Sequence, residues 1–139
     1  MGLDMIGEEE RDVAMRAMAG LTGGCFRGDF CGAIAGAVQV VGCLFARANS
    51  YEMEDARFTS TIKLVYDRLQ EKAVEKYGDT SCRTISRRDW LNPDDVKARR
   101  VDSRRDECAR FVGECAQILG DVLLEVVGVE ELKILQGAE

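Results

Sequence analysis

Six cysteines carry the most distinctive chemistry in this chain of 139 residues. They are Cys25, Cys31, Cys43, Cys82, Cys108 and Cys115. Cysteine thiolates bind metals and iron–sulfur clusters, and pairs of thiols exchange with disulfides. Histidine is absent, which excludes a histidine general base and a histidine ligand to zinc or haem. The sequence therefore favours chemistry at sulfur. A classical enzyme is disfavoured, because no pair of carboxylates can be placed in space.

The spacing of the cysteines limits which of them can pair. Cys108 and Cys115 lie on one predicted helix, about 10 Å apart along its axis. A disulfide needs Cα atoms within about 7 Å of each other, so these two cannot be joined. The same arithmetic separates Cys31 from Cys43 by about 18 Å. Any disulfide or shared metal must therefore join different elements of the fold.

Three cysteines are the candidate catalytic residues. Cys31 lies at the predicted start of a central helix, where free N–H groups and the helix dipole favour a thiolate. Cys82 lies in a loop beside Arg83, whose positive charge also favours a thiolate. Cys108 faces inward early in the last predicted helix. We expect these three residues to converge at one end of a helical bundle.

Helices are predicted to position these cysteines, because apolar residues recur at helical spacing and the chain has a single proline. The four main predicted helices span Glu8 to Ala19, Phe30 to Ala48, Glu52 to Tyr77, and Ser103 to Val127. Asp29 is the predicted N-cap of the second helix, and Gly78 and Gly128 are predicted to end the third and fourth. Cys43 and Cys115 lie within apolar stripes and are expected to fill the core.

The segments between these helices complete the predicted fold. A glycine-rich stretch, Gly20 to Gly28, precedes the second helix. A loop from Asp79 to Pro93 follows the third, with a short element at Cys82 inside it. Asn92 and Pro93 have the residue types of an N-cap and a first helical position, so a short helix is expected after them. The prediction is a single helical domain over residues 1–139, an all-α, irregular bundle of about four main helices with a loop insert.

The charge is acidic overall and uneven along the chain. The net charge is −6 and the sequence pI is about 4.8, so nucleic-acid binding is disfavoured. From Arg83 to Arg110, nine lysines and arginines accompany six acidic residues, a local charge of +3 that leaves −9 for the rest. This segment is either a solvated face with paired charges, or a docking patch for an acidic partner or an anionic ligand.

No segment is predicted to insert into a membrane. Residues 1–10 are acidic and lack an apolar core, so no signal peptide is expected and a reducing, cytoplasmic location is predicted. The apolar run from Phe30 to Ala46 has 17 residues, just short of a membrane span. Its small residues, including Gly32 and Gly36, instead favour close packing in a bundle. A second copy of the chain could cover an apolar surface left there, giving a homo-oligomer.

Three short motifs give the sequence a resemblance to a known family. They are Cys-Gly-Ala-Ile-Ala-Gly at Cys31 to Gly36, Gly-Asp-Thr-Ser-Cys-Arg at Gly78 to Arg83, and Cys108 on the final predicted helix. In this combination, over most of its length, the chain resembles the C_GCAxxG_C_C family of redox-active proteins. Members of that family are small, helical and mostly prokaryotic. The resemblance implies that Cys31, Cys82 and Cys108 are the second, third and fourth of four family cysteines.

The first family cysteine is expected upstream, on an earlier helix. Cys25 is the only cysteine before Cys31. Either Cys25 takes that place, or Cys43 or Cys115 does, or an N-terminal helix has been lost. The ligand set that the resemblance implies for a metal is Cys31, Cys82, Cys108 and Cys25. The small motif residues leave room for a ligand, a chain segment or a cluster, and are implied to bind the cofactor: Gly32, Ala33 and Gly36.

Two classes of function remain open at this point. The first is a redox or electron-transfer protein with a redox partner protein, using either an iron–sulfur cluster or thiol–disulfide exchange. The second is a structural or partner-binding helical module without redox turnover, in which cysteines bind zinc and Arg83 to Arg105 is the docking face. The sequence contains no Cys-x-x-Cys pair, and this disfavours both a zinc ribbon and a thioredoxin-like site. The cofactor is accordingly an iron–sulfur cluster, zinc or none.

Overall fold

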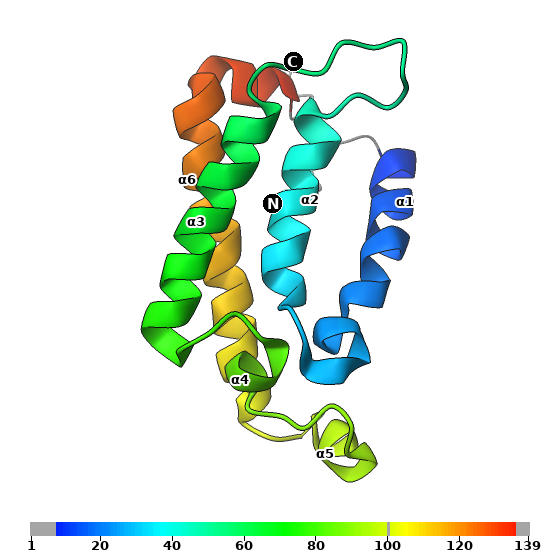
Figure 1. Ribbon diagram of the computed structural model, residues 1–139, viewed down its shortest axis with the longest axis vertical. Helices are drawn as coiled ribbons and strands as arrows, with labels where there is room; N and C mark the ends of the chain where they lie inside the picture. Colours follow the sequence, from blue (N-terminus) through cyan, green and yellow to red (C-terminus); the bar gives the residue numbers. More distant parts are fainter. Residues whose placement is uncertain (1–7, 100, 136–139) are drawn as a thin grey trace.

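Three long helices form the centre of the molecule. The computed structural model describes residues 8–99 and 101–135. α2 (Gly32–Phe45), α3 (Phe58–Tyr77) and α6 (Arg104–Leu135) lie side by side, and α1 (Glu8–Met18) runs along the outer side of α2 (Figure 1). Within the described ranges there is no strand, so the predicted all-α bundle is confirmed.

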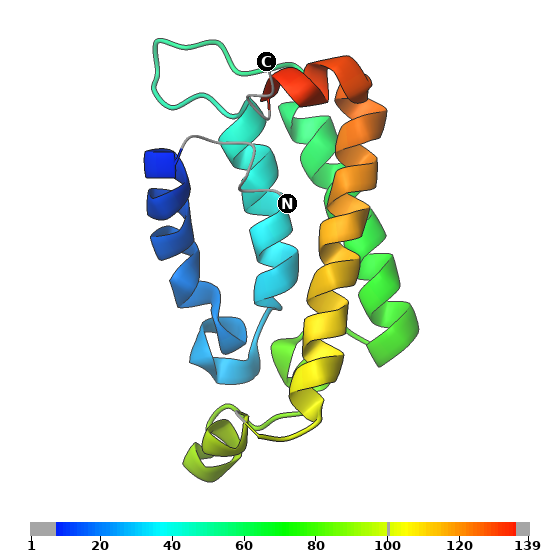
Figure 2. The same cartoon turned by 180° about the vertical axis from the view of Figure 1, so that it is seen from behind.

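Shorter elements lie at one end of this bundle. α4 (Cys82–Ser86) and α5 (Pro93–Ala98) lie near the beginnings of α2 and α6, whereas the loop of residues 46–57 lies at the opposite end (Figures 1 and 2). Two tight turns, η2 (Ala19–Leu21) and η3 (Gly24–Gly28), connect α1 to α2. The end that carries α4, α5 and these turns is the one where the central helix begins.

The core consists of one apolar face from each long helix. Its buried residues are Ile34, Ala37, Val40, Val41 and Phe45 of α2, Val65, Leu69 and Ala73 of α3, and Phe111, Cys115, Leu119, Val122 and Leu123 of α6. The α3 residues are four positions apart, which is the single stripe that the sequence predicts. Burying each large aliphatic side chain contributes about 1.5–3 kcal/mol. This packing holds the helix beginnings in fixed relative positions.

Local capping residues set several helix ends as predicted. Gly78 adopts a φ of 94° and ends α3. The side chain of Asn92 accepts hydrogen bonds from the N–H groups of Asp94 and Asp95 at the start of α5. At both places the residue type alone is enough to end or begin a helix.

The loop of residues 46–57 replaces parts of two predicted helices. α2 ends at Phe45 rather than Ala48, and α3 begins at Phe58 rather than Glu52. The Glu52 carboxylate accepts hydrogen bonds from the N–H of Ala48 (2.8 Å) and the side chain of Asn49 (2.7 Å). These side-chain contacts offer the backbone an alternative to a helix. The predicted boundaries were therefore wrong on both sides of the loop.

The start of α2 also differs from the prediction. The helix begins at Gly32 with Cys31 as its N-cap, not at Phe30 with Asp29 as the cap. Phe30 is paired instead with Ser81 in an isolated antiparallel bridge. Because this pairing requires extended backbone, it delays the first helical turn by two residues.

Gly128 divides α6 into two helical segments. Its φ of 74° and ψ of 169° are not helical, so the long segment ends there as predicted, and a shorter one runs on to Leu135. Among the helices in the described ranges, none combines the length and the apolar character that crossing a membrane requires.

Four consecutive residues before α2 adopt left-handed backbone conformations. Gly23, Gly24, Cys25 and Phe26 have φ values of 62°, 58°, 57° and 55°. Glycine adopts this conformation freely, whereas each residue with a side chain loses about 1–2 kcal/mol. The ring of Phe26 contacts the ring of Trp90 edge-on, and a Cβ on Gly23 would lie 2.3 Å from that ring. The strained turn is thus packed against Trp90.

Replacing Cys25 with glycine is expected to stabilise the fold by about 1 kcal/mol, because glycine adopts the left-handed conformation without the steric cost of a side chain. Cys43 is the matched control. It is also exposed, but it lies within α2, where glycine lowers stability by roughly 0.5–1 kcal/mol. Urea unfolding of the reduced variants measures both free energies. A loss of stability in Cys25→Gly would contradict the strained turn.

Alanine substitutions at Gly32 and Gly36 are expected to have opposite effects. A Cβ on Gly32 would lie 2.6 Å from the carbonyl oxygen of Leu21, which is backbone and cannot rotate away. Gly32→Ala is therefore expected to lower stability by about 1–3 kcal/mol. A Cβ on Gly36 would have no contact within 4 Å outside its own helix, so Gly36→Ala should add up to about 1 kcal/mol. Thermal unfolding distinguishes the two, and equal effects would contradict the close approach of η2 to α2.

Candidate functional site

A cavity of about 530 Å³ lies between the beginnings of α2, α4 and α6. Three of the six cysteines line it, namely Cys31, Cys82 and Cys108. Two small residues of the predicted cofactor-binding set, Gly32 and Ala33, line it as well. The structure therefore brings together, from three different helices, the cysteines that were singled out as catalytic.

Backbone pairing holds Cys31 and Cys82 near each other. The N–H of Cys31 donates to the carbonyl of Thr80 (3.0 Å), and the N–H of Cys82 donates to the carbonyl of Asp29 (2.5 Å). These two hydrogen bonds flank the Phe30–Ser81 bridge. Because successive side chains of extended backbone alternate between faces, Cys31 and Cys82 share the face opposite the bridge pair. Both are buried, with exposed fractions of 5% and 7%.

Hydroxyl groups fix Cys82 as the first residue of α4. The Oγ of Ser81 accepts the N–H of Thr84 (3.2 Å) and caps the helix. The Oγ of Ser86 donates to the carbonyl of Cys82 (2.5 Å) and accepts the indole N–H of Trp90 (3.1 Å). The short element predicted at Cys82 is this helix, and Ser86 at its end holds Trp90 in the lining of the cavity.

Burial keeps the thiols of Cys82 and Cys108 protonated at neutral pH. It raises the pKa of Cys82 to about 11, with a negative charge on Cys31 as the second cause. The pKa of Cys108 is also raised, first by burial and then by the charge on Cys31. The positive charges of Arg88 and Arg99 act on Cys108 in the opposite direction. Ionising all three thiols of this cavity together is therefore unfavourable in free energy.

Arg83 does not act on Cys82 as predicted. Its side chain is exposed, and its guanidinium donates to the carbonyl of Arg27 (3.3 Å). Its charge is not among the causes that set the pKa of Cys82, which burial raises. The prediction of a thiolate at Cys82 was wrong because sequence neighbours on a helix need not share an environment.

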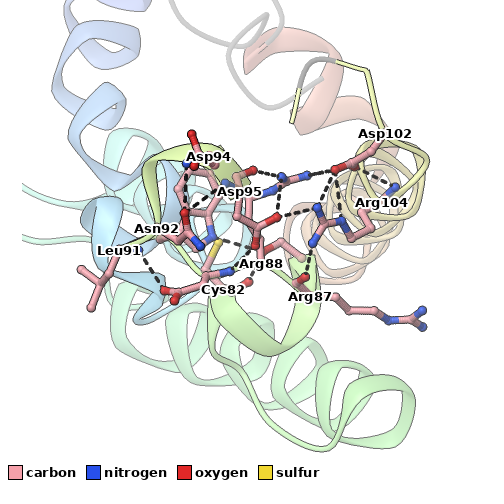
Figure 3. A network of polar contacts seen from close by, with 12 residues as sticks. Cys82, Arg87, Arg88, Leu91, Asn92, Asp94, Asp95, Asp102 and Arg104 are labelled. Atoms are coloured by element: carbon pink, nitrogen blue, oxygen red, sulfur yellow. Dashed lines mark hydrogen bonds and ion pairs between the residues drawn. The ribbon is translucent and has the colours of Figure 1, made fainter. Parts of the chain in front are cut away.

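A buried arginine supports the cavity on the side of α5. Arg88 has an exposed fraction of 2%. It donates to both carboxylate oxygens of Asp102 (2.9 and 3.1 Å) and to the backbone carbonyl of Asp95. Arg104 binds the same two aspartates at 2.5 and 2.7 Å (Figure 3). These contacts, those of Arg104 first, lower the pKa of Asp95 and of Asp102. Both arginines therefore tie α5 to the beginning of α6.

The sequence analysis missed two residues that shape the cavity, Arg88 and Trp90. Nothing distinguishes Arg88 from its neighbours in a basic segment, because its burial depends on aspartates that come later in the chain. Trp90 is the only tryptophan, and a large aromatic residue next to a candidate cysteine was a usable signal.

The remaining candidate residues lie outside the cavity. Cys25 is exposed in η3, and Gly36 does not line the cavity. Cys43 is exposed on α2, so the prediction that it fills the core was wrong. Cys115 is buried in the core as predicted, and burial raises its pKa to about 12. In the part of the chain that the structure describes, no three cysteine or acidic side chains are grouped to hold a metal ion. The ligand set that includes Cys25 stays a prediction.

Alkylation with iodoacetamide is expected to divide the cysteines of the folded protein into two groups. The exposed Cys25 and Cys43 should react at neutral pH, whereas the buried Cys82 and Cys115 should react only as the pH nears about 11 and 12. Because both pKa values are raised from 9.0 in the folded state, their contribution to stability is full below pH 9 and is lost progressively as the pH rises to about 11 and 12. Peptide mass spectrometry measures the labelling, and Cys82 reacting as fast as Cys43 at neutral pH would contradict it.

The arrangement of cysteines agrees with a comparison to known proteins. Residues 1–122 match the family described as "Putative redox-active protein (C_GCAxxG_C_C)". No curated protein and no solved structure gives a significant match to the chain. The family match covers Cys31, Cys82 and Cys108, so the resemblance seen in the motifs is confirmed. The chain belongs to the C_GCAxxG_C_C family.

Proposed function

We propose that this protein is a redox protein in which Cys31 and Cys82 alternate between two thiols and one disulfide. The observation that carries the proposal is their placement. Both are buried in the lining of one cavity and share the face opposite Phe30 and Ser81, one on each side of that bridge. Oxidation of the pair forms one S–S bond and releases two protons and two electrons. The redox-active description of the family supports this chemistry.

The three cysteines of the cavity have different roles in this proposal. The attacking species in an exchange is a thiolate. Cys31 is the N-cap of α2, where free N–H groups and the helix dipole favour a thiolate, so Cys31 is the residue expected to attack first. Cys82 lies on the same face of the paired segments and is the expected disulfide partner. Cys108 is half-buried on α6 in the same lining and is the alternative partner.

A redox partner and a reducing compartment belong to this proposal. All six cysteines are free thiols in the structure. A cytoplasmic environment keeps exposed cysteines such as Cys25 and Cys43 reduced. A reductant must return the disulfide to two thiols after each cycle, and a partner protein is proposed to do this.

An iron–sulfur cluster is the second candidate, favoured by the third cysteine. Cys31, Cys82 and Cys108 line one cavity, and positive charges of Arg88 and Arg99 act on Cys108. These cysteines would be the cluster's ligands, and a bound cluster would supply one-electron transfer. Zinc bound by cysteines is the alternative without redox turnover, and it would require Cys31, Cys82 and Cys108 to move closer together, since they are not grouped to hold one ion.

Treatment of the reduced protein with diamide, a small thiol oxidant, is expected to consume two thiols per chain and to link the peptides of Cys31 and Cys82. Mass spectrometry of the alkylated digest identifies the link. Cys31→Ser and Cys82→Ser should each abolish this link, because each removes one of its sulfurs. Cys43→Ser is the matched control, since Cys43 is exposed and outside the cavity. Links that involve only Cys25 or Cys43 would contradict the proposal.

Metal analysis separates the two candidates. The protein is purified without oxygen, and iron, acid-labile sulfide and zinc are measured per chain. Iron with matching sulfide that is lost in Cys31→Ser but kept in Cys43→Ser would favour the cluster. Zinc alone, lost in the same variant, would favour the non-redox alternative. A metal-free protein that forms the Cys31–Cys82 disulfide would support thiol–disulfide exchange.

A further inference from the structure

The lining of the cavity indicates which class of molecule reacts there. We propose that the substrate is a small disulfide whose ends carry carboxylate or phosphate groups, an inference that rests on the proposed thiol–disulfide exchange. Uncommitted positive charge, a rigid apolar wall and deeply placed sulfurs each restrict the ligand in a different way.

Two arginines bring uncommitted positive charge to the cavity. Arg99 and Arg105 both line it and are exposed. Neither forms an ion pair with any residue of the described ranges, whereas Arg88 and Arg104 in the same lining are paired with aspartates. Guanidinium groups bind carboxylates and phosphates with paired hydrogen bonds. The chain as a whole has a net charge of −6, so these two guanidinium groups favour an anion at the cavity only.

The wall beside this charge is apolar and rigid. Trp90 is buried and fixed by the hydroxyl of Ser86 and by the ring of Phe26. The guanidinium carbon of Arg99 lies 5.6 Å from the centroid of the Trp90 ring, within the range of a cation–π contact. The charge and the apolar surface are therefore adjacent. A ligand with a short hydrocarbon segment between its anionic end and its sulfur satisfies both.

The depth of the sulfurs favours a small substrate over a protein. Cys31 and Cys82 are only 5% and 7% exposed, so a small disulfide reaches them more readily than the disulfide of a folded protein does. The cavity of about 530 Å³ is in the range of small-molecule sites. A small disulfide can enter the cavity entirely and place its S–S bond at Cys31.

The reaction balances without any further reagent. The Cys31 thiolate attacks one sulfur of R–S–S–R, so that bond breaks, a Cys31–S–S–R bond forms and one R–S⁻ leaves. Cys82 loses its proton and attacks the Cys31 sulfur, which forms the Cys31–Cys82 bond and expels the second R–S⁻. The two expelled thiolates take up the two protons that the cysteines lost. Two protein thiols are oxidised, and one small disulfide is reduced to two thiols.

Three matched disulfides test the inference. Dithiodipropionate carries two carboxylates, bis(2-hydroxyethyl) disulfide is neutral, and cystamine carries two ammonium groups. The rate of Cys31–Cys82 formation with each is divided by its rate with the urea-unfolded protein, which removes intrinsic reactivity. Dithiodipropionate is expected to be the fastest by this measure, and added salt should reduce its advantage.

Arginine variants locate the preference. Arg99→Gln and Arg105→Gln should each slow dithiodipropionate about fivefold, and leave the neutral disulfide unchanged. Arg110→Gln is the control, since Arg110 is exposed on the same helix as Arg105 and does not line the cavity. Thermal unfolding checks that each variant is folded.

The outcomes separate this inference from the proposed function. Equal normalised rates for the three probes, unaffected by Arg99→Gln, would overturn the anionic specificity and leave the exchange standing. Faster reaction with an oxidised protein, such as oxidised thioredoxin, would overturn it in favour of a protein substrate. If diamide forms no Cys31–Cys82 disulfide, the exchange itself fails. Calorimetry with thiodipropionate, a thioether that cannot exchange, then tests the anion site alone, and no binding would overturn that site.

Discussion

Two backbone hydrogen bonds join the segment before α2 to the segment before α4, and in each the donor is the N–H group of a cysteine. The first N–H groups of a helix have no partner within the helix. Cys31, the N-cap of α2, and Cys82, the first residue of α4, have such groups, and they use them on each other's segments. The pairing therefore uses no N–H group that either helix needs for its own hydrogen bonds. It determines where both begin, and so where Trp90 and the cavity lining lie.

Charge at this end of the bundle follows one rule, that a buried group is either paired or neutral. Arg88 is charged and is paired with Asp95 and Asp102. No cation is among the causes that set the pKa of Cys82, and burial keeps its thiol protonated. A disulfide is neutral as well, so oxidation of Cys31 and Cys82 would place no new charge in the interior. The buried environment is thus compatible with both the thiol form and the disulfide form of the pair.

Features that depend on local residue type could be predicted from the sequence, and features that depend on distant contacts could not. The core stripe of α3, its end at Gly78 and the cap at Asn92 follow from spacing and side-chain chemistry. The meeting of the three cysteines followed from their positions at a helix start, a loop and a helix face. Phe30 was misassigned because its partner lies in a distant segment. Cys43 was misassigned because α2 is almost wholly apolar, and a helix without a polar face does not show which side is exposed.

A bond between Cys31 and Cys82 would join two segments that the bridge already holds together. In the chain-entropy view, closing a loop of roughly 50 residues stabilises a fold by about 4 kcal/mol. By linkage, the fold would stabilise the disulfide to the same extent, which corresponds to a reduction potential lower by about 90 mV. The raised pKa of Cys82 lowers its thiolate fraction, which slows the second attack without changing the equilibrium between the end states. Such a site would be readily oxidised at equilibrium but slow to react, unless a ligand bound in the cavity holds its S–S bond against Cys31. The reaction rate at such a site depends most on groups that position the ligand at the edge of the cavity, and Arg99 and Arg105 are exposed residues of its lining.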